Sequence, residues 1–509
     1  MNVNPLTKTD YPDPDVIRVG DTYYMVSTTM HFMPGCVILR SYNLVDWEIL
    51  TYVYKTLELT DEECLRNGKN AYGRGMWAAT LRFHKGIFYI CFVANDTGKT
   101  YLFRSKNIMG PWQRSEIEGF YHDSSLLFDD DGKVYIAYGN RQIYITELNE
   151  SLTAPKQGGF NQMVVEDPHE VFLGYEGTHF YKINGKYYLF FIHLIKRDNT
   201  RRSQACYVAD RIEGPYRGGE VLDTDGGYCN SGVAQGGIVD TPNNEWYSIL
   251  FRDSGAVGRV PVLVPLTWQE DYPLFGVNGE IPEQISPYDS RPGYRYAPLY
   301  GGDEFIDGEL ANIWQWNHVP QEEYIQTGQG ALCIQTSVLC NNVTQAPNTL
   351  TQRLMYPGSV VSVELDGSEL QDGDVAGLCM LQSDYGLIGI TKQGDEYALV
   401  QWQRPEEAEG NMNPATDTTK PKEVARVSLR EPVIRLRAKA EFTEMKDVAE
   451  FAVSWDGNWQ VFGERMKLYF KLDHFCGVRA GLFCYATKKV GGKAKFRHFQ
   501  HELLLTSLD

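Results

Sequence analysis

The stretch DYPDPDVIRVGDTYYMV (10–26) decides the fold of this chain. Three aspartates and two prolines precede an apolar segment, a Gly-Asp pair and a second segment rich in aromatic residues. Gly-Asp is a pair that two-residue β-turns favour, so the stretch predicts a hairpin of two strands. The acidic residues lie where the first strand begins, and we expect at least one of them to have a function.

The same pattern of apolar strand, tight polar turn and aromatic-rich strand occurs five times. The segments are VIRVGDTYYMVS (16–27), LRFHKGIFYICF (81–92), LLFDDDGKVYIAY (126–138), HFYKINGKYYLFF (179–191) and GIVDTPNNEWYSIL (237–250). One tyrosine from each, at positions 24, 89, 135, 188 and 247, gives intervals of 65, 46, 53 and 59 residues. These intervals suit a blade of four strands with its loops, so residues 1–290 are predicted to form a five-bladed β-propeller. The alternative is an irregular β-sandwich.

A second domain is predicted after the propeller. Residues 283–301 contain three prolines and no alternation of apolar and polar residues, which is typical of a linker. The following segments alternate over short distances and show no helical period, so 291–509 is predicted to be a concanavalin-like β-sandwich. A chain of 509 residues is also too long for one hydrophobic core. The fold class is therefore all-β.

The charge and the termini restrict the partners and the compartment. A net charge of −18 argues against nucleic acid as a partner. The chain has no run of about 18 apolar residues, which argues against a membrane partner. The ten cysteines are scattered without a CxxC pair, as expected for reduced thiols, and the first residues lack the pattern of a secretory signal. We expect a cytoplasmic protein; its oligomeric state is left open.

One position in each repeat is expected to face the central channel. Counting back eleven residues from the first tyrosine, and twelve from each of the others, selects Asp13, Trp77, Asp123, Glu176 and Gln235. Equivalent positions on the innermost strands of a propeller form a ring, so three carboxylates should meet there. Like charges and partial burial separate the pKa values of such groups, which provides the acid and the base that glycosidic bond cleavage needs. The tryptophan offers a flat face for a sugar ring.

The motifs around these acids resemble those of glycoside hydrolase family 43. The segments are YPDPDVIRVGDTYYM (11–25), HDSSLLFDDDGKVYIAYG (122–139) and EGTHFYKINGKYYLFF (176–191). The resemblance extends to the xylosidase-like branch with a C-terminal β-sandwich. It implies an inverting mechanism with Asp13 as general base, Glu176 as general acid and Asp123 as the carboxylate that tunes the acid and orients the substrate. Inversion implies that the carboxyl groups of base and acid stand roughly 6.5–9.5 Å apart.

The resemblance also implies further residues of the substrate site. The segment GRVPVLVPLTW (258–268) resembles the one whose arginine points into the funnel, so Arg259 should pair with Asp123 or a sugar hydroxyl. The segment TTMHFMPG (28–35) resembles the wall of the sugar pocket, with His31, Phe32 and Met33 as candidates. Many members have histidine, near calcium or water, where this chain has Gln235. An amide is a weaker calcium ligand, so we expect no required cofactor and no metal ligand, and leave calcium in the channel as an alternative.

These observations predict an exo-acting glycosidase of hemicellulose fragments. It would remove terminal α-L-arabinofuranosyl or β-D-xylosyl residues, or both, from arabino-xylooligosaccharides. The alternatives are an endo-arabinanase, which needs an open cleft, and a sugar-binding propeller without catalysis, which needs no three acids. The C-terminal domain could bind sugar through its tryptophans, but a structural role is favoured for Trp314, Trp316, Trp402, Trp455 and Trp459.

Overall fold

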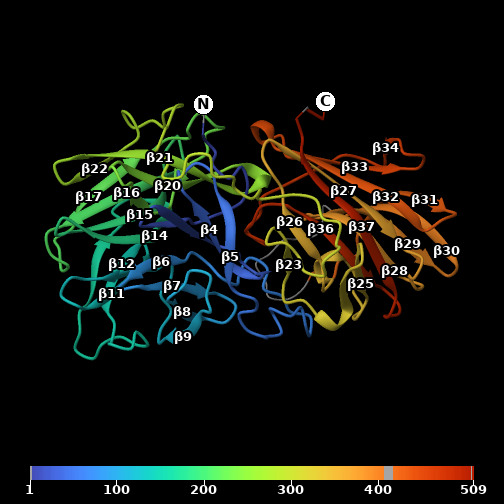
Figure 1. Ribbon diagram of the computed structural model, residues 1–509, viewed down its shortest axis with the longest axis horizontal. Helices are drawn as coiled ribbons and strands as arrows, with labels where there is room; N and C mark the ends of the chain where they lie inside the picture. The colour runs from blue at the N-terminus through green and yellow to red at the C-terminus, as the bar shows by residue number, and fades with distance from the viewer. Residues whose placement is uncertain (1–2, 406–416, 506, 509) are drawn as a thin grey trace.

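The chain folds into two β-rich domains that lie side by side (Figure 1). The computed structural model describes residues 3–405, 417–505 and 507–508. Its only helices within those residues are four short 3₁₀ turns, and none is long and apolar enough to span a membrane. They are η1 (Gly255–Val257), η2 (Glu322–Tyr324), η3 (Val343–Gln345) and η4 (Thr443–Met445).

The N-terminal domain is a five-bladed β-propeller, as predicted. Each of its five sheets runs outward in chain order from the strand nearest the centre. Blade 1 contains β1 (Asp15–Val19), β2 (Thr22–Ser27), β4 (Gly35–Ser41) and β5 (Glu48–Tyr54), and blade 2 contains β6 (Thr80–His84), β7 (Ile87–Ala94), β8 (Lys99–Ser105) and β9 (Gln113–Ile117). Blade 3 contains β10 (Ser125–Phe128), β11 (Val134–Asn140), β12 (Gln142–Glu147) and β13 (Asn161–Glu166), and blade 4 contains β14 (Val171–Ile183), β15 (Lys186–Ile195), β16 (Arg202–Ala209) and β17 (Arg217–Leu222). Blade 5 contains β18 (Val233–Ala234), β20 (Trp246–Asp253), β21 (Arg259–Gln269) and β22 (Tyr272–Phe275), with β19 (Ile238–Asp240) also paired to β20.

The predicted hairpin tyrosines all lie on the second main strand of their blades, on β2, β7, β11, β15 and β20. Two of the connecting turns, Lys85-Gly86 and Asn184-Gly185, have positive φ at both residues. Such turns follow the right-handed twist of the flanking strands, so they fix the register of each hairpin. Each repeat in the sequence therefore corresponds to one blade of the propeller.

Apolar contacts between neighbouring blades close the ring. Strands such as β15 are buried along almost their whole length, because each blade packs against another on both faces. Five clusters fill the five interfaces: Ile38 with Phe92 (blades 1 and 2), Leu102 with Leu126 (2 and 3), Ala137 with Phe191 (3 and 4), Phe190 with Val264 (4 and 5), and Ile249 with Met25 (5 and 1). The ring therefore has no free sheet face between blades.

The C-terminal domain is a sandwich of two large antiparallel sheets. One sheet contains β23 (Gln315–Asn317), β26 (Leu350–Arg353), β36 (Arg479–Ala486), β28 (Asp374–Leu381), β29 (Gly386–Gln393), β30 (Glu396–Gln403) and β31 (Lys422–Leu429). The other contains β24 (Ile325–Gly328), β25 (Ala331–Gln335), β37 (Lys493–Leu503), β27 (Gly358–Asp366), β32 (Val433–Glu441), β33 (Val448–Ser454), β34 (Trp459–Val461) and β35 (Met466–Lys467). Their inner faces share one large core.

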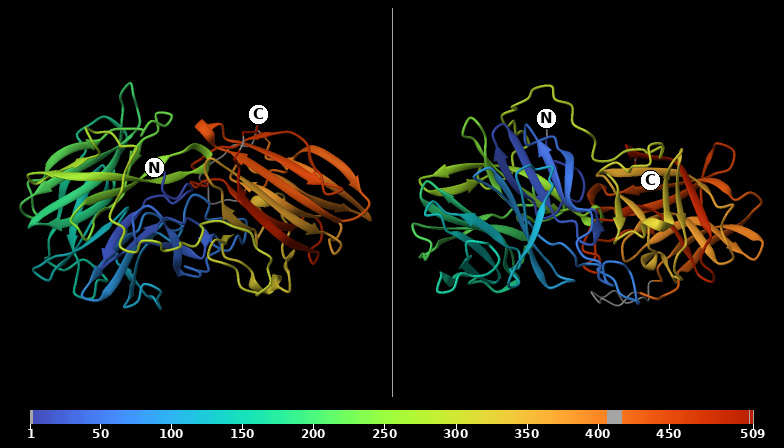
Figure 2. Two further views of the ribbon diagram at one scale, coloured as in Figure 1. Left: turned by 45° about the horizontal axis from the view of Figure 1, so that its top comes forward. Right: turned by 60° about the horizontal axis from the view of Figure 1, so that its bottom comes forward.

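The two domains are joined by more than the linker. No named strand lies between Phe275 and Gln315, and this segment crosses from the propeller to the sandwich (Figure 2). The predicted boundary at 290/291 falls within it and stays a prediction; the ends 1–2 and 509 of the predicted ranges lie outside the described residues. A short propeller strand, β3 (Phe32–Met33), pairs with β23 and so extends the first sandwich sheet. The domains therefore form one continuous sheet at their interface.

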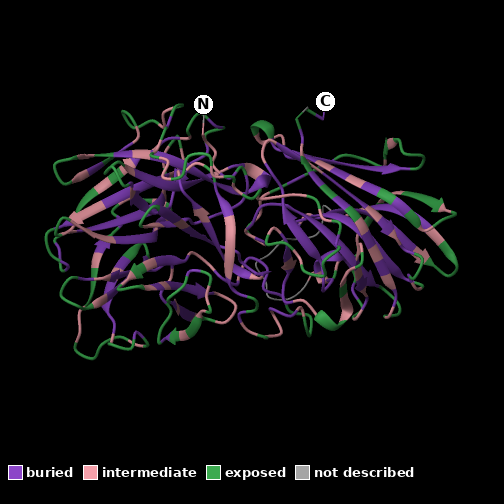
Figure 3. Cartoon of the chain, viewed as in Figure 1, coloured by how far each residue is buried: buried purple, intermediate pink, exposed green. Residues whose placement is uncertain are grey.

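Burial follows this architecture. Buried residues run along the strands of both domains, and exposed residues gather at the outer turns (Figure 3). The tryptophans proposed as a sugar platform do not share one exposed face. Trp314 is buried and donates to Asp303, Trp316 and Trp402 pack partly into the core, and Trp459 lies against two arginines. The contacts of these four fit the structural role, whereas Trp455 is exposed at 42%.

Candidate active site

The five ring residues lie at the same end of the propeller. Asp13, Trp77 and Asp123 lie two or three residues before the first strands of blades 1, 2 and 3. Glu176 lies in the irregular first half of β14, and Gln235 follows β18. Three of them, Asp13, Asp123 and Gln235, have φ between 47° and 57°. Left-handed backbone at a non-glycine residue is costly and persists where the surrounding structure imposes it, which is common at functional sites.

Asp13 is held from two sides. Oδ1 lies 2.9 Å from Nη1 of Arg259, and Oδ2 accepts a hydrogen bond of 2.6 Å from Oγ1 of Thr28. The expected pairing of Arg259 with Asp123 is wrong. Arg259 begins β21, which runs beside the N-terminal segment and accepts a hydrogen bond from the Tyr11 backbone, so its side chain reaches the neighbouring Asp13. The guanidinium compensates the charge of an ionised Asp13.

The other two aspartates of the opening stretch have different tasks. Asp15 is buried on the channel side of the ring, where its carboxylate contacts Arg82 of blade 2 at 2.7 Å and His179 of blade 4 at 3.1 Å. Burial raises the pKa of Asp15, but Arg82 and His179 lower it more, to about 2. Asp10 accepts backbone hydrogen bonds from Arg259 and from Gly477 of the sandwich. Asp15 therefore ties blades together, and Asp10 ties the domains together.

A histidine connects the other two acids of the ring. Nε2 of His122 lies 3.2 Å from Oε2 of Glu176 and 3.8 Å from Oδ2 of Asp123. The side-chain amide of Asn140 donates a second hydrogen bond, of 2.5 Å, to the same oxygen of Glu176. The Glu176 side chain keeps 18% of its surface exposed, so it stays accessible from the funnel.

The charges in this cluster oppose one another. Burial raises the pKa of Asp123, and the carboxylates of Glu176 and Asp13 raise it further, whereas His122 lowers it. Burial lowers the pKa of His122, but the neighbouring carboxylates outweigh this effect and raise it to about 9. The ring thus holds protons on Asp123 and His122 near neutral pH, at a site where an uncompensated set of carboxylates would be unstable.

Glycine is required beside the acid. Gly177 has φ +62°, and its backbone amide donates a hydrogen bond of 3.1 Å to Asp123. A Cβ on Gly177 would lie 2.5 Å from the side chain of Gln235, so a larger residue would displace that amide. Glu176, Asp123 and Gln235 are therefore packed around one backbone position.

The sandwich contributes one wall of the site. The ring of Phe475 lies 5.6 Å from that of Trp77, and its face lies 4.4 Å from the guanidinium of Arg259. The backbone carbonyl of Phe475 also accepts a hydrogen bond from Arg259. On its other side, Trp77 lies 6.0 Å from His122. An aromatic surface from both domains therefore borders the three acids.

The segment expected to wall the sugar pocket has a different position. His31 and Phe32 are buried at the domain interface, where His31 contacts His318 and the Arg479 guanidinium lies over the Phe32 ring. Met33 pairs with β23. These contacts show that the segment joins the domains, because its extended residues complete the sandwich sheet. A role in holding sugar stays a prediction.

The channel residues do not fit the calcium ion that was left as an alternative. Calcium needs several free oxygen ligands. Both oxygens of Asp15 already contact cationic or N–H groups, and the side chain of Gln235 packs against Gly177. The ligand atoms of His122, Asp123 and Glu176 lie within 4.8 Å of one another, but Oε2 of Glu176 already contacts His122 and accepts a hydrogen bond from Asn140, and Asp123 accepts one from the amide of Gly177.

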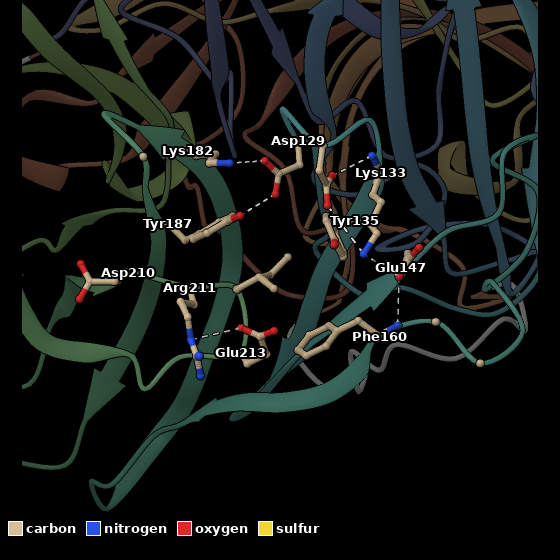
Figure 4. A pocket seen from close by; sticks show the side chains of 15 residues that line it. Asp129, Lys133, Tyr135, Glu147, Phe160, Lys182, Tyr187, Asp210, Arg211 and Glu213 are labelled. Carbon is tan, nitrogen blue, oxygen red and sulfur yellow. Dashed lines mark hydrogen bonds and ion pairs between the residues drawn. The ribbon is translucent and has the colours of Figure 1, made fainter.

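A pocket of about 630 Å³ lies at the opposite end of blades 3 and 4 (Figure 4). It is lined by Asp129 and Lys133 of the β10–β11 connection, by Lys182 of β14 and by Tyr187 of β15. Its charges are already paired: Asp129 contacts Lys182 and accepts a hydrogen bond of 2.6 Å from Tyr187. The aspartate-rich turn at 129–132 therefore supports a hairpin, and its Asp129 is occupied by Lys182 and Tyr187.

Sequence reasoning missed His122, Asn140 and Phe475. His122 directly precedes Asp123, so its position next to a predicted ring residue was the available signal. Asn140 is the last residue of β11 in blade 3, and it reaches Glu176 only because blade 4 lies beside blade 3. Phe475 carries no signal, because a loop 299 residues after Glu176 (475 − 176) approaches the site only when the domains are docked.

Comparisons with known proteins agree with this geometry. The family model described as glycosyl hydrolases family 43 matches residues 3–273, and the model described as β-xylosidase C-terminal concanavalin A-like domain matches residues 302–502. A β-xylosidase of Formosa agariphila is 26% identical over 556 residues, which cover 96% of this chain and 88% of that protein.

Two solved structures are similar over 99% of this chain. A bifunctional GH43-CE protein of Bacteroides eggerthii is 39% identical with a TM-score of 0.90, and the match covers 64% of that longer chain. A GH43 glycoside hydrolase, engineered in its active site to display both endo-xylanase and exo-arabinofuranosidase activity, is 28% identical with a TM-score of 0.88 and is covered to 99%.

Proposed function

The chain belongs to glycosyl hydrolases family 43, and from this premise we propose that it is an inverting exo-acting glycosidase. It removes terminal β-D-xylosyl residues, α-L-arabinofuranosyl residues or both from arabino-xylooligosaccharides. The name of the Formosa relative, β-xylosidase, supports the first sugar, and the exo-arabinofuranosidase activity of the engineered GH43 enzyme supports the second. Both sugars are neutral pentoses, which suits a site whose charges compensate one another.

We propose that Asp13 is the general base. It takes a proton from a water molecule that attacks the anomeric carbon, while Arg259 and Thr28 hold its two oxygens in place. Glu176 is the general acid and protonates the departing glycosidic oxygen. Its oxygen is positioned by His122 and Asn140. In an inverting enzyme the base and the acid act from opposite faces of the sugar.

Asp123 is proposed to control the proton of the acid. Its carboxyl group shares His122 with Glu176, and its pKa is raised by burial and by the neighbouring carboxylates. The single observation that carries the proposal is this asymmetry: one carboxylate of the ring is paired with an arginine, and the other two share a histidine. A base and an acid need such different environments.

The exo mode of action is supported by Phe475. An endo-acting enzyme needs a cleft that is open across the propeller, and here the sandwich inserts an aromatic side chain beside Trp77 and Arg259. A funnel that is closed on one side can admit the end of an oligosaccharide, but it obstructs an oligosaccharide that would lie across the propeller. Trp77 offers the flat face on which the terminal sugar would stack.

We further propose that the reaction needs no cofactor and that the enzyme works in the cytoplasm. The cofactor proposal is supported by Arg82, which supplies the positive charge that Asp15 would otherwise take from a cation. The cytoplasmic proposal is supported by the cysteines, all ten of which are free thiols and eight of which are buried. Free thiols persist in reducing compartments.

The test measures hydrolysis of 4-nitrophenyl β-D-xyloside, 4-nitrophenyl α-L-arabinofuranoside and natural arabino-xylooligosaccharides. Wild type should release single pentoses, and NMR should show the anomer opposite to that of the substrate. Glu176→Gln should lose about 10²–10⁴-fold in kcat on the oligosaccharides, because removal of a general acid costs that much. The loss should be smaller on 4-nitrophenyl substrates, whose leaving group needs little protonation.

A matched control is Glu166→Gln, an exposed carboxylate at the end of β13 that lies outside the ring. It should keep the activity of wild type. Equal activity of Glu176→Gln and wild type on oligosaccharides would remove Glu176 as the acid. Release of internal fragments instead of single sugars would contradict the exo mode.

A further inference from the structure

A second cluster of histidine and aspartate lies on blade 4, outside the acidic ring. Asp167 and His169 stand in the connection between β13 and β14, and His193 lies near the end of β15. Oδ1 of Asp167 is 3.0 Å from Nδ1 of His169, and Oδ2 is 3.1 Å from Nδ1 of His193. One ligand atom from each of the three residues lies within 4.8 Å of the other two. The cluster has no part in the proposed reaction.

Asp167 is a buried carboxylate without a fixed cation. Its side chain has no exposed surface, and among the described residues its ion-pair partners are the two imidazoles, with no lysine or arginine. The backbone amide of His169 adds one hydrogen bond of 3.0 Å. A buried carboxylate is stable only when its charge is compensated. A positive charge between Asp167 and the two histidines would provide this compensation.

His193 is oriented for a metal ion on Nδ1. Its side chain is also fully buried, and Nε2 points to Oε2 of Glu220 at 3.6 Å. Glu220 is held by Ser203 at 2.7 Å and by Arg197 at 3.1 Å. A metal-binding histidine commonly gives its second N–H to a carboxylate, which fixes the tautomer and makes the other nitrogen a better ligand. The pair of His193 and Glu220 approximates this arrangement: at 3.6 Å it lies just beyond hydrogen-bond distance, and the buried Nε2 of His193 has no hydrogen-bond partner among the described residues.

We propose that Asp167, His169 and His193 bind one divalent transition-metal ion such as zinc. Two imidazole nitrogens and one carboxylate oxygen are the donors that such ions prefer, and Pro168 keeps the first two ligands in a short rigid segment. Binding moves the Nδ1 proton of each imidazole to Nε2 or to solvent. The His169 side chain is 41% exposed, so the ion has a path from solvent and room for water as a fourth ligand.

The site would support the strand that carries Glu176. The backbone amide of Asp167 donates a hydrogen bond of 2.9 Å to Arg141, and the amide of Arg141 donates one of 2.8 Å to Tyr175. The intervening first half of β14 has irregular pairing from Val171 to Glu176. An ion bound just before β14 would stabilise this segment, whose pairing with β15 is irregular. This role is structural and does not depend on the proposed function.

The experiment uses full-length protein that has been dialysed against a chelator and then against metal-free buffer. Titration with zinc chloride by calorimetry should show one site per chain, and elemental analysis after gel filtration should find one zinc. The melting temperature should rise with zinc. His169→Ala should lose stoichiometric binding and the rise in melting temperature. Glu220→Gln should bind about 10–100-fold more weakly, which is the usual effect of changing a group that supports a metal ligand.

Two control variants separate this site from other histidines. His122→Asn alters the second cluster that contains a histidine and acids, and His498→Ala alters an exposed histidine paired with Glu304. Both should bind zinc like wild type. Metal-free His169→Ala should melt like metal-free wild type, because the replaced side chain is half-exposed. The proposal fails if wild type binds no stoichiometric zinc, if His169→Ala still binds it, or if His122→Asn abolishes it.

Discussion

The funnel and the domain interface both bury histidine, with opposite results. In the funnel, His122 lies between carboxylates, which raise its pKa to about 9. At the interface, His31, His318 and His474 lie against one another and against Tyr72. Burial lowers the pKa of His318 to about 3 and holds those of His31 and His474 well below the usual range.

The difference shows that burial alone does not decide the charge of a histidine. Burial opposes the imidazolium in both regions, and only the carboxylates of the funnel reverse its effect. The carboxylates of the funnel therefore keep His122 charged, whereas the histidines of the interface stay neutral and pack like aromatic residues. Three predictions follow this contrast, from the largest expected effect to the smallest.

Acid should destabilise the interface most. The folded pKa values of the three histidines lie below the unfolded value of about 6.5, so their contribution to stability is complete well above pH 6.5 and is lost as pH falls through that value. Between pH 6.5 and pH 5 the loss is about 1.6 kcal/mol for each histidine that stays neutral in the folded protein, and about 5 kcal/mol for all three. Urea denaturation at a series of pH values measures it. His474→Phe keeps the ring stack on Tyr72 and should reduce the loss by about 1.6 kcal/mol.

The matched control is His122→Asn. The folded pKa of His122 is raised, so its contribution is complete below pH 6.5 and is lost as pH rises through about 9. This variant should change the pH dependence of stability above pH 6.5 and leave the acid loss as in wild type. If His474→Phe and wild type lose the same free energy between pH 6.5 and pH 5, the neutral interface cluster is refuted.

The second largest effect is expected on removal of the Arg259 guanidinium from the funnel, which should lower the free energy of unfolding. Arg259→Leu leaves Asp13 buried without its guanidinium, and breaking a buried ion pair typically costs about 3–5 kcal/mol. The double variant Arg259→Leu/Asp13→Leu should recover part of this loss, because it removes the unpaired charge as well. Chemical denaturation at pH 7 measures both variants.

An exposed ion pair provides the reference. Arg291 and Asp21 lie 3.0 Å apart, with about half of each side chain exposed, so Arg291→Leu should cost less than about 1 kcal/mol. Equal costs for Arg259→Leu and Arg291→Leu would mean that the charge of Asp13 is compensated by other groups.

The smallest effect concerns the pH profile. His122→Asn removes the positive charge that lowers the pKa of Asp123, so the acidic ring should keep its proton to higher pH. The basic limb of the profile of kcat/KM should move upward by about one pH unit. His84→Asn, at the opposite end of β6, should keep the profile of wild type. A downward shift in His122→Asn would contradict the proposed sharing of the proton.

Most of the propeller could be predicted from local features of the sequence. A hairpin depends on a turn of two residues and on alternating side chains, and five such hairpins at similar intervals leave few other folds. The ring positions followed from the same period, because each lies eleven or twelve residues before a tyrosine of fixed register. For Glu176 the count still succeeded although β14 is irregular and one of its register shifts lies between Glu176 and His179, on the side of the counted tyrosine.

The partners of the acids could not be predicted in the same way. Asp10, Asp13 and Asp15 look alike in the sequence, yet one bonds to the sandwich, one to Arg259 and one to Arg82 and His179. The pairing of Arg259 was mispredicted because it depends on which strand lies beside the N-terminal segment. That neighbour is set when blade 5 closes the ring.

The sequence by itself determined the five blades, the sandwich and the identity of the three acids, because turns and strand periods act over a few residues. The tertiary structure alone decided which acid meets a cation, which histidine holds a charge, and that Phe475 borders the site. Those properties depend on burial and on groups that are hundreds of residues apart in the chain. Electrostatic free energies follow distance and solvent access in space, and neither can be read from spacing along the sequence.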